Sequence, residues 1–346
     1  MSHKRRAPWW IHSFVWIGAF VMVVAASAAT VTQLTINRVN DSVATSDLLG
    51  ENRADFNPDD IKGPLNFLVL GVDKEDDGFS RADTVMIAHI SEDLDKTYLV
   101  SLPRDLYVEV ADCGSGFPCQ GKLNSSASRF QDWDKSQANI LQTITNLTGV
   151  KFHGAVHANF DGFMDLIDLI GEVELCPWHD ITSIHGDKKT YPAGCDMYDK
   201  EDALDLVRQR YGWDSDEDYA NGTWGDFGRQ KMQQQAIMNL LQGAKDKGYH
   251  KDPVKAVEML DGIGSNLTVD LGEVKLTDFI VALRGLDPKD MKQLKVPSEA
   301  QDIGSQSFVV MNEMNGQKQA ADELWEAIQN DTLDDWIAQN PDWVNE

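Results

Sequence analysis

The sequence predicts an α/β domain in which the strands of one sheet alternate with helices. Three short apolar runs, at residues 67–72, 85–90 and 98–102, have the length and β-branched content of buried strands. Further along the chain, apolar residues recur at helical spacing in several segments that other strand-like runs separate. No composition break or linker follows residue 63, so residues 63–346 are predicted to form one domain.

The later elements follow from the same periodicity. Residues 136–148 place apolar side chains on one helical face, and Gly149 favours a helix end directly after them. Residues 152–159 read as a strand that leads into a helix capped by Asn159 or Asp161. The other predicted strands are 107–110, 173–175, 292–296 and 308–311, and the other predicted helices are 199–211, 226–241, 253–260, 275–285 and 320–329.

The N-terminus has the pattern of a membrane anchor. Residues 1–8 form a basic tail, and residues 9–31 are apolar over a length that can span a bilayer, which takes roughly 20 helical residues. The basic flank predicts a single-pass protein of the cell membrane with its N-terminus in the cytoplasm and its domain outside. A cleaved signal peptide is the alternative, because Ala26-Ser27-Ala28 resembles a cleavage site. Residues 32–62 are polar and are predicted to be an extracytoplasmic linker.

The charge of the chain restricts its partners. Acidic residues outnumber basic ones by 56 to 31, which gives a formal net charge of −25. Non-specific nucleic-acid binding requires a basic face, so nucleic acid is not an expected partner. Any bound polyanion must be held by a local cluster of arginines.

The four cysteines fit an oxidising compartment outside the cytoplasm. Cys113 and Cys119 enclose a short loop, and Cys176 and Cys195 bracket a longer one. Four cysteines allow three pairings, between which the sequence alone cannot choose; we favour the two local pairs. A metal site is the alternative, because two histidines lie inside the second bracket, but the spacing matches no zinc pattern.

Polar side chains stand where the first three predicted strands begin or end. Asp73 follows the first strand, Arg81 and Asp83 precede the second, and Arg104 follows the third. If the strands are neighbours, two carboxylates and two guanidinium groups gather along one edge of the sheet. Mg²⁺ takes one or two carboxylates together with substrate phosphate oxygens, and guanidinium groups bind phosphate through paired hydrogen bonds. The stretch therefore predicts part of a phosphate and metal site.

Other basic and amide side chains extend this prediction. Lys122 could help to hold a phosphate, although a solvated loop lysine is the plainer interpretation. Arg208 and Arg210 end a predicted helix, where they could equally complement the helix dipole. Arg229 and Gln233 are four residues apart, so they share a face near the N-terminus of the next helix, where anions bind.

An apolar stripe on the helix after residue 159 has two interpretations. Phe163, Leu166, Ile167 and Ile170 form one face. They are either ordinary core or the wall of a groove for a lipid chain. Between this helix and the one at 226, residues 213–224 form an acidic, aromatic insert that is expected to be a mobile surface loop near the arginines.

Several familiar chemistries are excluded by motif. The sequence contains no Gly-x-x-x-x-Gly-Lys-Ser/Thr loop, no Gly-x-Gly-x-x-Gly turn and no Gly-x-Ser-x-Gly elbow. The histidines show no metal-ligand spacing. The remaining arginine-rich, carboxylate-bearing site points to phosphoryl chemistry.

In six blocks, the chain resembles the LytR-CpsA-Psr family of membrane-anchored cell-wall phosphotransferases. The blocks run in order from residue 66 to about residue 241, and together they are a specific signal. They are Arg81-Ala82-Asp83-Thr84, Ser101-Leu102-Pro103-Arg104-Asp105, Lys122-Leu123-Asn124, Asn159-Phe160-Asp161-Gly162-Phe163, Val207-Arg208-Gln209-Arg210, and Asp226-Phe227-Gly228-Arg229 with Gln233-Gln234.

The resemblance implies a mixed central sheet flanked by helices on both sides, with a polyprenyl chain in an apolar groove. It implies transfer of a glycopolymer phosphate from an undecaprenyl-pyrophosphate carrier to a sugar hydroxyl of peptidoglycan. In this chain, Asp73 and Asp83 would hold Mg²⁺ or Mn²⁺. The pyrophosphate would be surrounded by Arg81, Arg104, Arg208, Arg210 and Arg229, with help from Gln233 and Lys122.

The chain departs from the family pattern in places, and rival functions remain. Met232 stands where the family often has another arginine, and the insert at 213–224 is longer than expected. A separate C-terminal domain, which some relatives carry, is not expected after the catalytic part. The cysteines resemble those of high-GC Gram-positive relatives, some of which modify a surface protein instead. The alternatives are a polyprenyl-pyrophosphate phosphatase and a non-catalytic, lipid-phosphate-binding envelope regulator.

Overall fold

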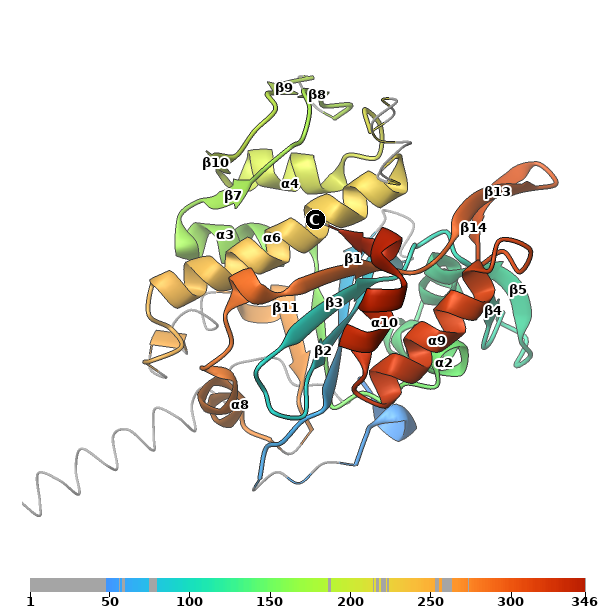
Figure 1. Cartoon of the computed structure of the whole chain (residues 1–346), viewed down its shortest axis with the longest axis horizontal. Coiled ribbons are helices and arrows are strands. Elements are labelled where there is room, and N and C mark those ends of the chain that lie inside the picture. Colours follow the sequence, from blue (N-terminus) through green and yellow to red (C-terminus); the bar gives the residue numbers. More distant parts are fainter. Residues whose placement is uncertain are drawn as a thin grey trace, which may run out of the picture.

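A mixed β-sheet forms the centre of the fold (Figure 1). The computed structural model describes residues 48–345 except 56, 58–59, 75–79, 186–187, 214, 216–217, 219–221, 223, 253–254, 257–262 and 273. Within these residues, seven strands run in the order β11-β6-β1-β2-β3-β12-β15. Their bounds are β1 Leu65–Lys74, β2 Ser80–Ile90, β3 Thr97–Ser101, β6 Gly154–Ala158, β11 Leu267–Asp270, β12 Lys292–Lys295 and β15 Val344–Asn345.

The strand directions bring several strand ends to one edge of the sheet. β2 is antiparallel to both β1 and β3, while β6 is parallel to β1 and β12 is parallel to β3. The outer strands β11 and β15 are antiparallel to their neighbours. As a result, β1, β3, β6 and β12 end, and β2 begins, along a single edge, which we call the carboxyl edge. The predicted adjacency of the first three strands is confirmed.

Helices cover both faces of the sheet, as predicted. On one face, α2 (Trp133–Thr148), α9 (Gln317–Gln329) and α10 (Leu333–Gln339) pack on alternate residues such as Leu68, Leu70 and Val100. On the other face, α3 (Phe160–Ile170) and α8 (Leu276–Leu283) pack against β1, β6 and β11, and Phe279 of α8 meets Phe67 edge to face. Figure 1 shows the long helix α6 (Asp226–Asp246) and α4 (Lys200–Arg208) above the central strands.

Helix ends follow the capping residues. Asp132 caps α2 through the N–H groups of Asp134 and Lys135, and Gly149 ends that helix at φ 65°, a conformation that favours glycine. Asn159 caps α3, which decides between the two predicted caps. α4 ends at Arg208 and not at residue 211 as predicted, because Gln209 is extended at ψ 123°.

A second apolar cluster lies between α3, α4 and α6. It includes Ile167, Leu206, Trp213 and Met232, and it packs against β7 (Val173–Leu175). The disulfide Cys176–Cys195 closes the segment that follows β7. The disulfide Cys113–Cys119 closes a shorter loop elsewhere in the fold. Both predicted local pairs are therefore confirmed.

Short elements complete the described fold. The strands outside the central sheet are β4 Tyr107–Val110, β5 Cys119–Lys122, β8 Ile181–Thr182, β9 Thr190–Tyr191, β10 Asp196–Tyr198, β13 Glu299–Ile303 and β14 Gln306–Val310. The 3₁₀ turns are η1 Gly50–Asn52, η2 Leu123–Ser128, η3 Gly264–Asn266, η4 Pro288–Asp290 and η5 Pro341–Trp343. Most of the helix predicted at 253–260 lies outside the described residues.

The C-terminal end of the predicted linker is part of the folded structure. Leu49 is buried in the main core, and Arg53 forms an ion pair with Asp270 of β11. The predicted tail and anchor, residues 1–31, lie outside the described residues. No helix within the described residues is long and apolar enough to cross a membrane.

Candidate functional site

A backbone irregularity at the carboxyl edge places Asp83. In the register of β1 with β2, Gly71 lies opposite Thr84 but Val72 lies opposite Ala82, so Asp83 is an extra residue without a direct partner. Such a bulge bends the strand and redirects a side chain, and bulges are common beside active sites. The redirected carboxylate of Asp83 forms an ion pair with Arg104, which follows β3.

The turn after β3 adds a second carboxylate. One carboxylate oxygen of Asp105 lies 3.6 Å from Nε of Arg104. The other oxygen forms an ion pair with Nζ of Lys122, at 2.8 Å. The backbone holds these parts together, because the N–H of Asn124 donates to the carbonyl of Arg104 at 2.9 Å. Lys122 therefore lies among these charged groups and is not a solvated loop lysine.

The two arginines at the end of α4 have different environments. Arg210 lies beyond the helix, and its guanidinium group is 3.5 Å from both Asp105 and Asp226. Arg208 is the last helical residue, and its guanidinium group lies over the ring of Phe160, 4.3 Å from the ring centroid. Because the helix stops between them, only Arg210 forms ion pairs with these carboxylates.

The N-terminus of α6 completes the group. Arg229 is only 3% exposed; it lies 2.9 Å from Asp226 and donates to the backbone carbonyl of Asp83, also at 2.9 Å. Gln233 donates to the carbonyl of Val207 at 3.2 Å and so joins α6 to the end of α4. We call Lys122, Arg104, Arg210 and Arg229 with Asp83, Asp105 and Asp226 the Arg-Asp cluster.

Burial and neighbouring charges act in opposite directions on this cluster. For Arg104, burial disfavours the charge, but Asp83 and the other carboxylates outweigh it and raise the pKa. For Arg229, burial is the larger effect and lowers the pKa. Burial would raise the pKa of Asp105, but the hydrogen bond from Lys122 and the nearby guanidinium groups hold that pKa below its usual range.

Three N–H groups of the Arg-Asp cluster are buried without a hydrogen-bond acceptor. They are the Nε groups of Arg104, Arg210 and Arg229, of which the first two lie 3.6 and 3.5 Å from a carboxylate oxygen without forming a hydrogen bond. A buried donor without an acceptor costs free energy, and groups of this kind call for an explanation. Phosphate oxygens are good acceptors for guanidinium groups, because the planar fork matches their geometry. The arrangement therefore fits a phosphate-bearing ligand.

Not all predicted site residues meet in this cluster. The backbone of Asp73 lies opposite Arg81, but the side chain of Asp73 lies outside the described part of the structure. Arg81 is exposed. The predicted magnesium pair of Asp73 and Asp83 therefore stays a prediction. Among the described residues, a group of three metal-ligand types within 4.8 Å occurs at Glu174, Cys176 and Cys195, where both cysteines are in the disulfide.

The predicted lipid stripe lies within apolar clusters. Ile167 and Ile170 are buried against α4, α6 and β7, with Phe163 at the margin. Leu166 is half-buried on the side that faces β11. The role of these four residues as the wall of a groove for a lipid chain stays a prediction.

The sequence interpretation missed three charged groups. Asp105 directly follows Arg104 in one quoted motif, and Asp226 stands three residues before Arg229 in another. This proximity to an arginine was the signal that the sequence offered. The third is Lys295, at the end of β12. It lies opposite Ser101 in the parallel register, on the face that α6 covers, and it donates to the carbonyl of Gly222 at 3.1 Å.

The insert at 213–224 is partly anchored. Trp213 is fully buried and stacks on Trp178, with ring centroids 4.2 Å apart. The carboxylate of Asp218 is also buried, 2.6 Å from Nε1 of Trp178 and 2.8 Å from Nε2 of His179. These contacts join the insert to the segment between the second pair of cysteines, so its described part is not a free surface loop.

Lys295 gives a prediction on the pH dependence of stability. It is 4% exposed, and burial, together with repulsion from Lys231, lowers its pKa from 10.5 to about 8. Between these values the unfolded chain binds more protons, so stability rises with pH across this window. Lys295→Met should remove a pH-dependent rise of about 1–3 kcal/mol in the free energy of unfolding. Denaturant unfolding at pH 7 and at about pH 9.5 tests this, and equal pH slopes for the variant and wild type would contradict it.

Comparison with known proteins agrees with the fold and the motifs. The model of the LytR_cpsA_psr family matches residues 29–329, so the chain belongs to this family. The polyisoprenyl-teichoic acid–peptidoglycan teichoic acid transferase TagU of Oceanobacillus iheyensis is 26% identical over 294 residues, which are 82% of this chain and 84% of that protein. The protein of the same name from Enterococcus faecalis is 29% identical over 61% of this chain and 62% of its own length.

The solved structures share the fold. TagT bound to LI-WTA superimposes with a TM-score of 0.59 at 18% identity, covering 84% of this chain and 99% of TagT. At this identity the likeness concerns the fold.

Proposed function

We propose that this chain is a membrane-anchored phosphotransferase that moves a glycopolymer phosphate from an undecaprenyl-pyrophosphate carrier to a cell-wall acceptor. The observation that carries the proposal is the Arg-Asp cluster, in which three buried guanidinium Nε–H groups lack an acceptor at the carboxyl edge. The names of the TagU relatives, which are teichoic acid transferases, support the same class of reaction.

The arginines would act by positioning and by neutralising charge. Phosphoryl transfer needs both more than it needs covalent help from the protein. Arg104, Arg210 and Arg229 approach from three different segments of the chain, so together they can hold a pyrophosphate from several sides. Asp83 and Asp105 fix the orientation of Arg104 before a substrate binds, which lowers the cost of reorganisation.

The proposal includes a divalent metal ion bound by the carboxylates of this site. Arg104 contacts one oxygen of Asp83, which leaves the second oxygen for Mg²⁺ or Mn²⁺ together with Asp73. A bound divalent ion would neutralise the charge on the phosphate oxygens. The hard carboxylate oxygens at this position fit such an ion.

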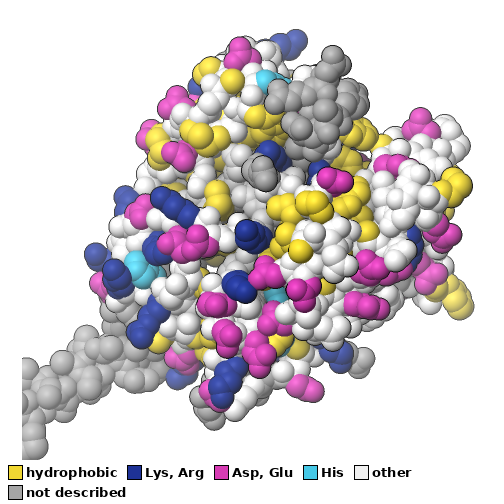
Figure 2. Space-filling model, in the orientation of Figure 1, with side chains coloured by type: hydrophobic (Ala, Val, Ile, Leu, Met, Phe, Trp, Pro, Cys, Tyr) yellow, Lys and Arg dark blue, Asp and Glu magenta, His cyan; other side chains and the backbone are white. Residues whose placement is uncertain are grey.

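The proposal also names an acceptor and a membrane partner. The TagU names support peptidoglycan as the acceptor, and a surface protein is the alternative. Figure 2 shows acidic and basic side chains interspersed on the face drawn, and the net charge of −25 disfavours nucleic acid as a partner. The apolar run at 9–31 supports an anchor in the cell membrane, with the domain outside.

The full-length protein in detergent, a prenyl-pyrophosphate-linked saccharide and peptidoglycan test the proposal. We expect transfer of the saccharide phosphate to peptidoglycan, its loss with a chelator and its return with excess Mg²⁺. Release of phosphate without transfer would indicate a pyrophosphatase. Binding of the lipid without any turnover would indicate a non-catalytic regulator.

A further inference from the structure

One hairpin joins the Arg-Asp cluster to an exposed aromatic residue. β4 and β5 pair from Tyr107 with Lys122 to Val110 with Cys119, and the loop beyond them carries Phe117. The side chain of Phe117 is 72% exposed. Burial of a ring exposed to this extent against a ligand would gain hydrophobic free energy.

The loop that carries Phe117 is firmly built. The disulfide Cys113–Cys119 closes it, and the N–H of Cys113 donates to the carbonyl of Phe117 at 3.1 Å. One oxygen of Asp112 accepts from the N–H groups of Gly114 and Gly116, at 2.8 and 2.9 Å. An exposed ring on a fixed loop loses little entropy when a ligand binds.

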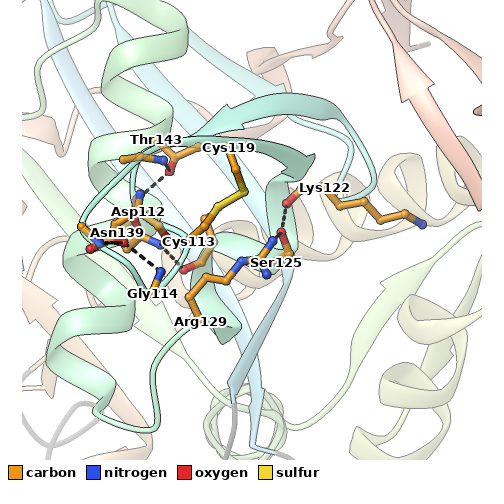
Figure 3. The surroundings of a disulfide bond; sticks show 12 residues. Asp112, Cys113, Gly114, Cys119, Lys122, Ser125, Arg129, Asn139 and Thr143 are labelled. Atoms are coloured by element: carbon orange, nitrogen blue, oxygen red, sulfur yellow. Dashed lines mark hydrogen bonds between the residues drawn. A yellow bond between two sulfur atoms is a disulfide. The ribbon is translucent and has the colours of Figure 1, made fainter.

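Helix α2 holds the base of the same loop. Asn139 receives the N–H of Asp112 at 2.8 Å and donates to its carbonyl at 2.9 Å, and Thr143 receives the N–H of Ala111. Figure 3 shows these contacts gathered around the disulfide, while the side chain of Lys122 extends away from it. The loop and Lys122 are thus the two ends of one rigid hairpin.

The outward face of the hairpin has the chemistry of a sugar-binding surface. Val108 and Val110 point into the core, so Tyr107 and Glu109 lie on the opposite face with their partners Lys122 and Gln120. Phe308 of β14 covers the end of this face next to the cluster, with its ring centroid 5.0 Å from that of Tyr107 and 5.3 Å from Nζ of Lys122. Glu109 and Gln120 are exposed polar groups between the cluster and the loop. Sugar hydroxyls can pair with such groups, and the C–H face of a sugar ring can stack on an aromatic ring.

We propose that the open part of this face, from Glu109 and Gln120 to Phe117, docks the glycan chain of the acceptor, with Phe117 stacking on a sugar ring. The inference rests on the proposed function and names the element that positions the acceptor. The hairpin runs from the phosphate-binding cluster for several residues at about 3.3 Å each, so it can guide a short oligosaccharide toward the cluster. The exposed Glu109, in a chain of net charge −25, disfavours an anionic membrane surface as the occupant.

Phe117→Ala in the full-length protein tests the proposal. Loss of one stacked ring should raise the KM for peptidoglycan glycan strands about tenfold and leave kcat at saturating acceptor unchanged. Phe117→Trp, which keeps an aromatic face, should restore the wild-type KM. Val281→Ala removes an exposed apolar side chain of α8, 48% exposed, and should change neither value.

Two further measurements separate this inference from the proposed function. Lipid-pyrophosphate binding should be equal in wild type and Phe117→Ala, because the ring is outside the Arg-Asp cluster. Co-sedimentation with purified peptidoglycan needs no turnover, so a loss in Phe117→Ala would support the docking face even if no transfer occurs. Equal sedimentation and equal KM would overturn it. So would binding to phosphatidylglycerol vesicles that requires Phe117 while glycan binding does not.

Discussion

Arg104→Ala should lower the rate of phosphoryl transfer by about 10²–10³-fold, the usual cost of removing one preorganised donor from a site that stabilises negative charge. Arg104 is the residue through which Asp83 and Asp105 are connected. Its loss removes a cation from the proposed pyrophosphate site and also leaves Asp83 without its partner. Transfer of phosphate to peptidoglycan under saturating lipid substrate is the measurement.

Two control variants make this result specific. Arg104→Lys keeps the charge but not the planar fork, so a loss close to that of Ala would show that the geometry of the guanidinium group matters. Arg284→Ala removes an exposed arginine after α8 and should leave the rate unchanged. A rate for Arg104→Ala within about threefold of wild type would show that the cluster does not stabilise the transition state.

The strands and helices that build the site could be predicted because their signals are local. The β1, β2 and β3 runs are apolar and β-branched, and the cap at Asn159 is directly before its helix. The edge strands β11 and β15, of four and two residues, were missed, although the four-residue strand at 107–110 was predicted. Their place in the sheet depends on partners that are far away in the sequence.

The site was predictable in its residues more than in its contacts. Arg208 and Arg210 belong to one motif, yet only Arg210 forms ion pairs with the cluster carboxylates, because α4 ends between them. Asp105 was quoted in a motif, but its pairing with Lys122 depends on the β4–β5 hairpin. Sequence motifs identify which groups carry charge, while the turns decide which charges meet.

Asp270→Ala should have the largest effect on stability. This carboxylate is 3% exposed and receives the N–H groups of Leu48 and Leu49, at 2.8 and 3.0 Å, and of Gly272, at 2.9 Å. Nη2 of Arg53 lies 2.6 Å away. Removing one partner of a buried, hydrogen-bonded ion pair leaves the other groups unsatisfied, so we expect a loss of about 3–5 kcal/mol in the free energy of unfolding. Denaturant unfolding measures it.

Hydrogen exchange locates the same effect in the chain. Since Asp270 holds Leu48 and Leu49 against β11, their amides should lose protection in Asp270→Ala. Asp60→Ala is the matched control, because it breaks an exposed ion pair with Lys62 and should leave the free energy of unfolding nearly unchanged. If Asp270→Ala were as mild as the control, the linker end would not depend on this carboxylate. A large loss would show that the segment around Leu48, Leu49 and Arg53 is fixed to the edge strand β11 through this one carboxylate.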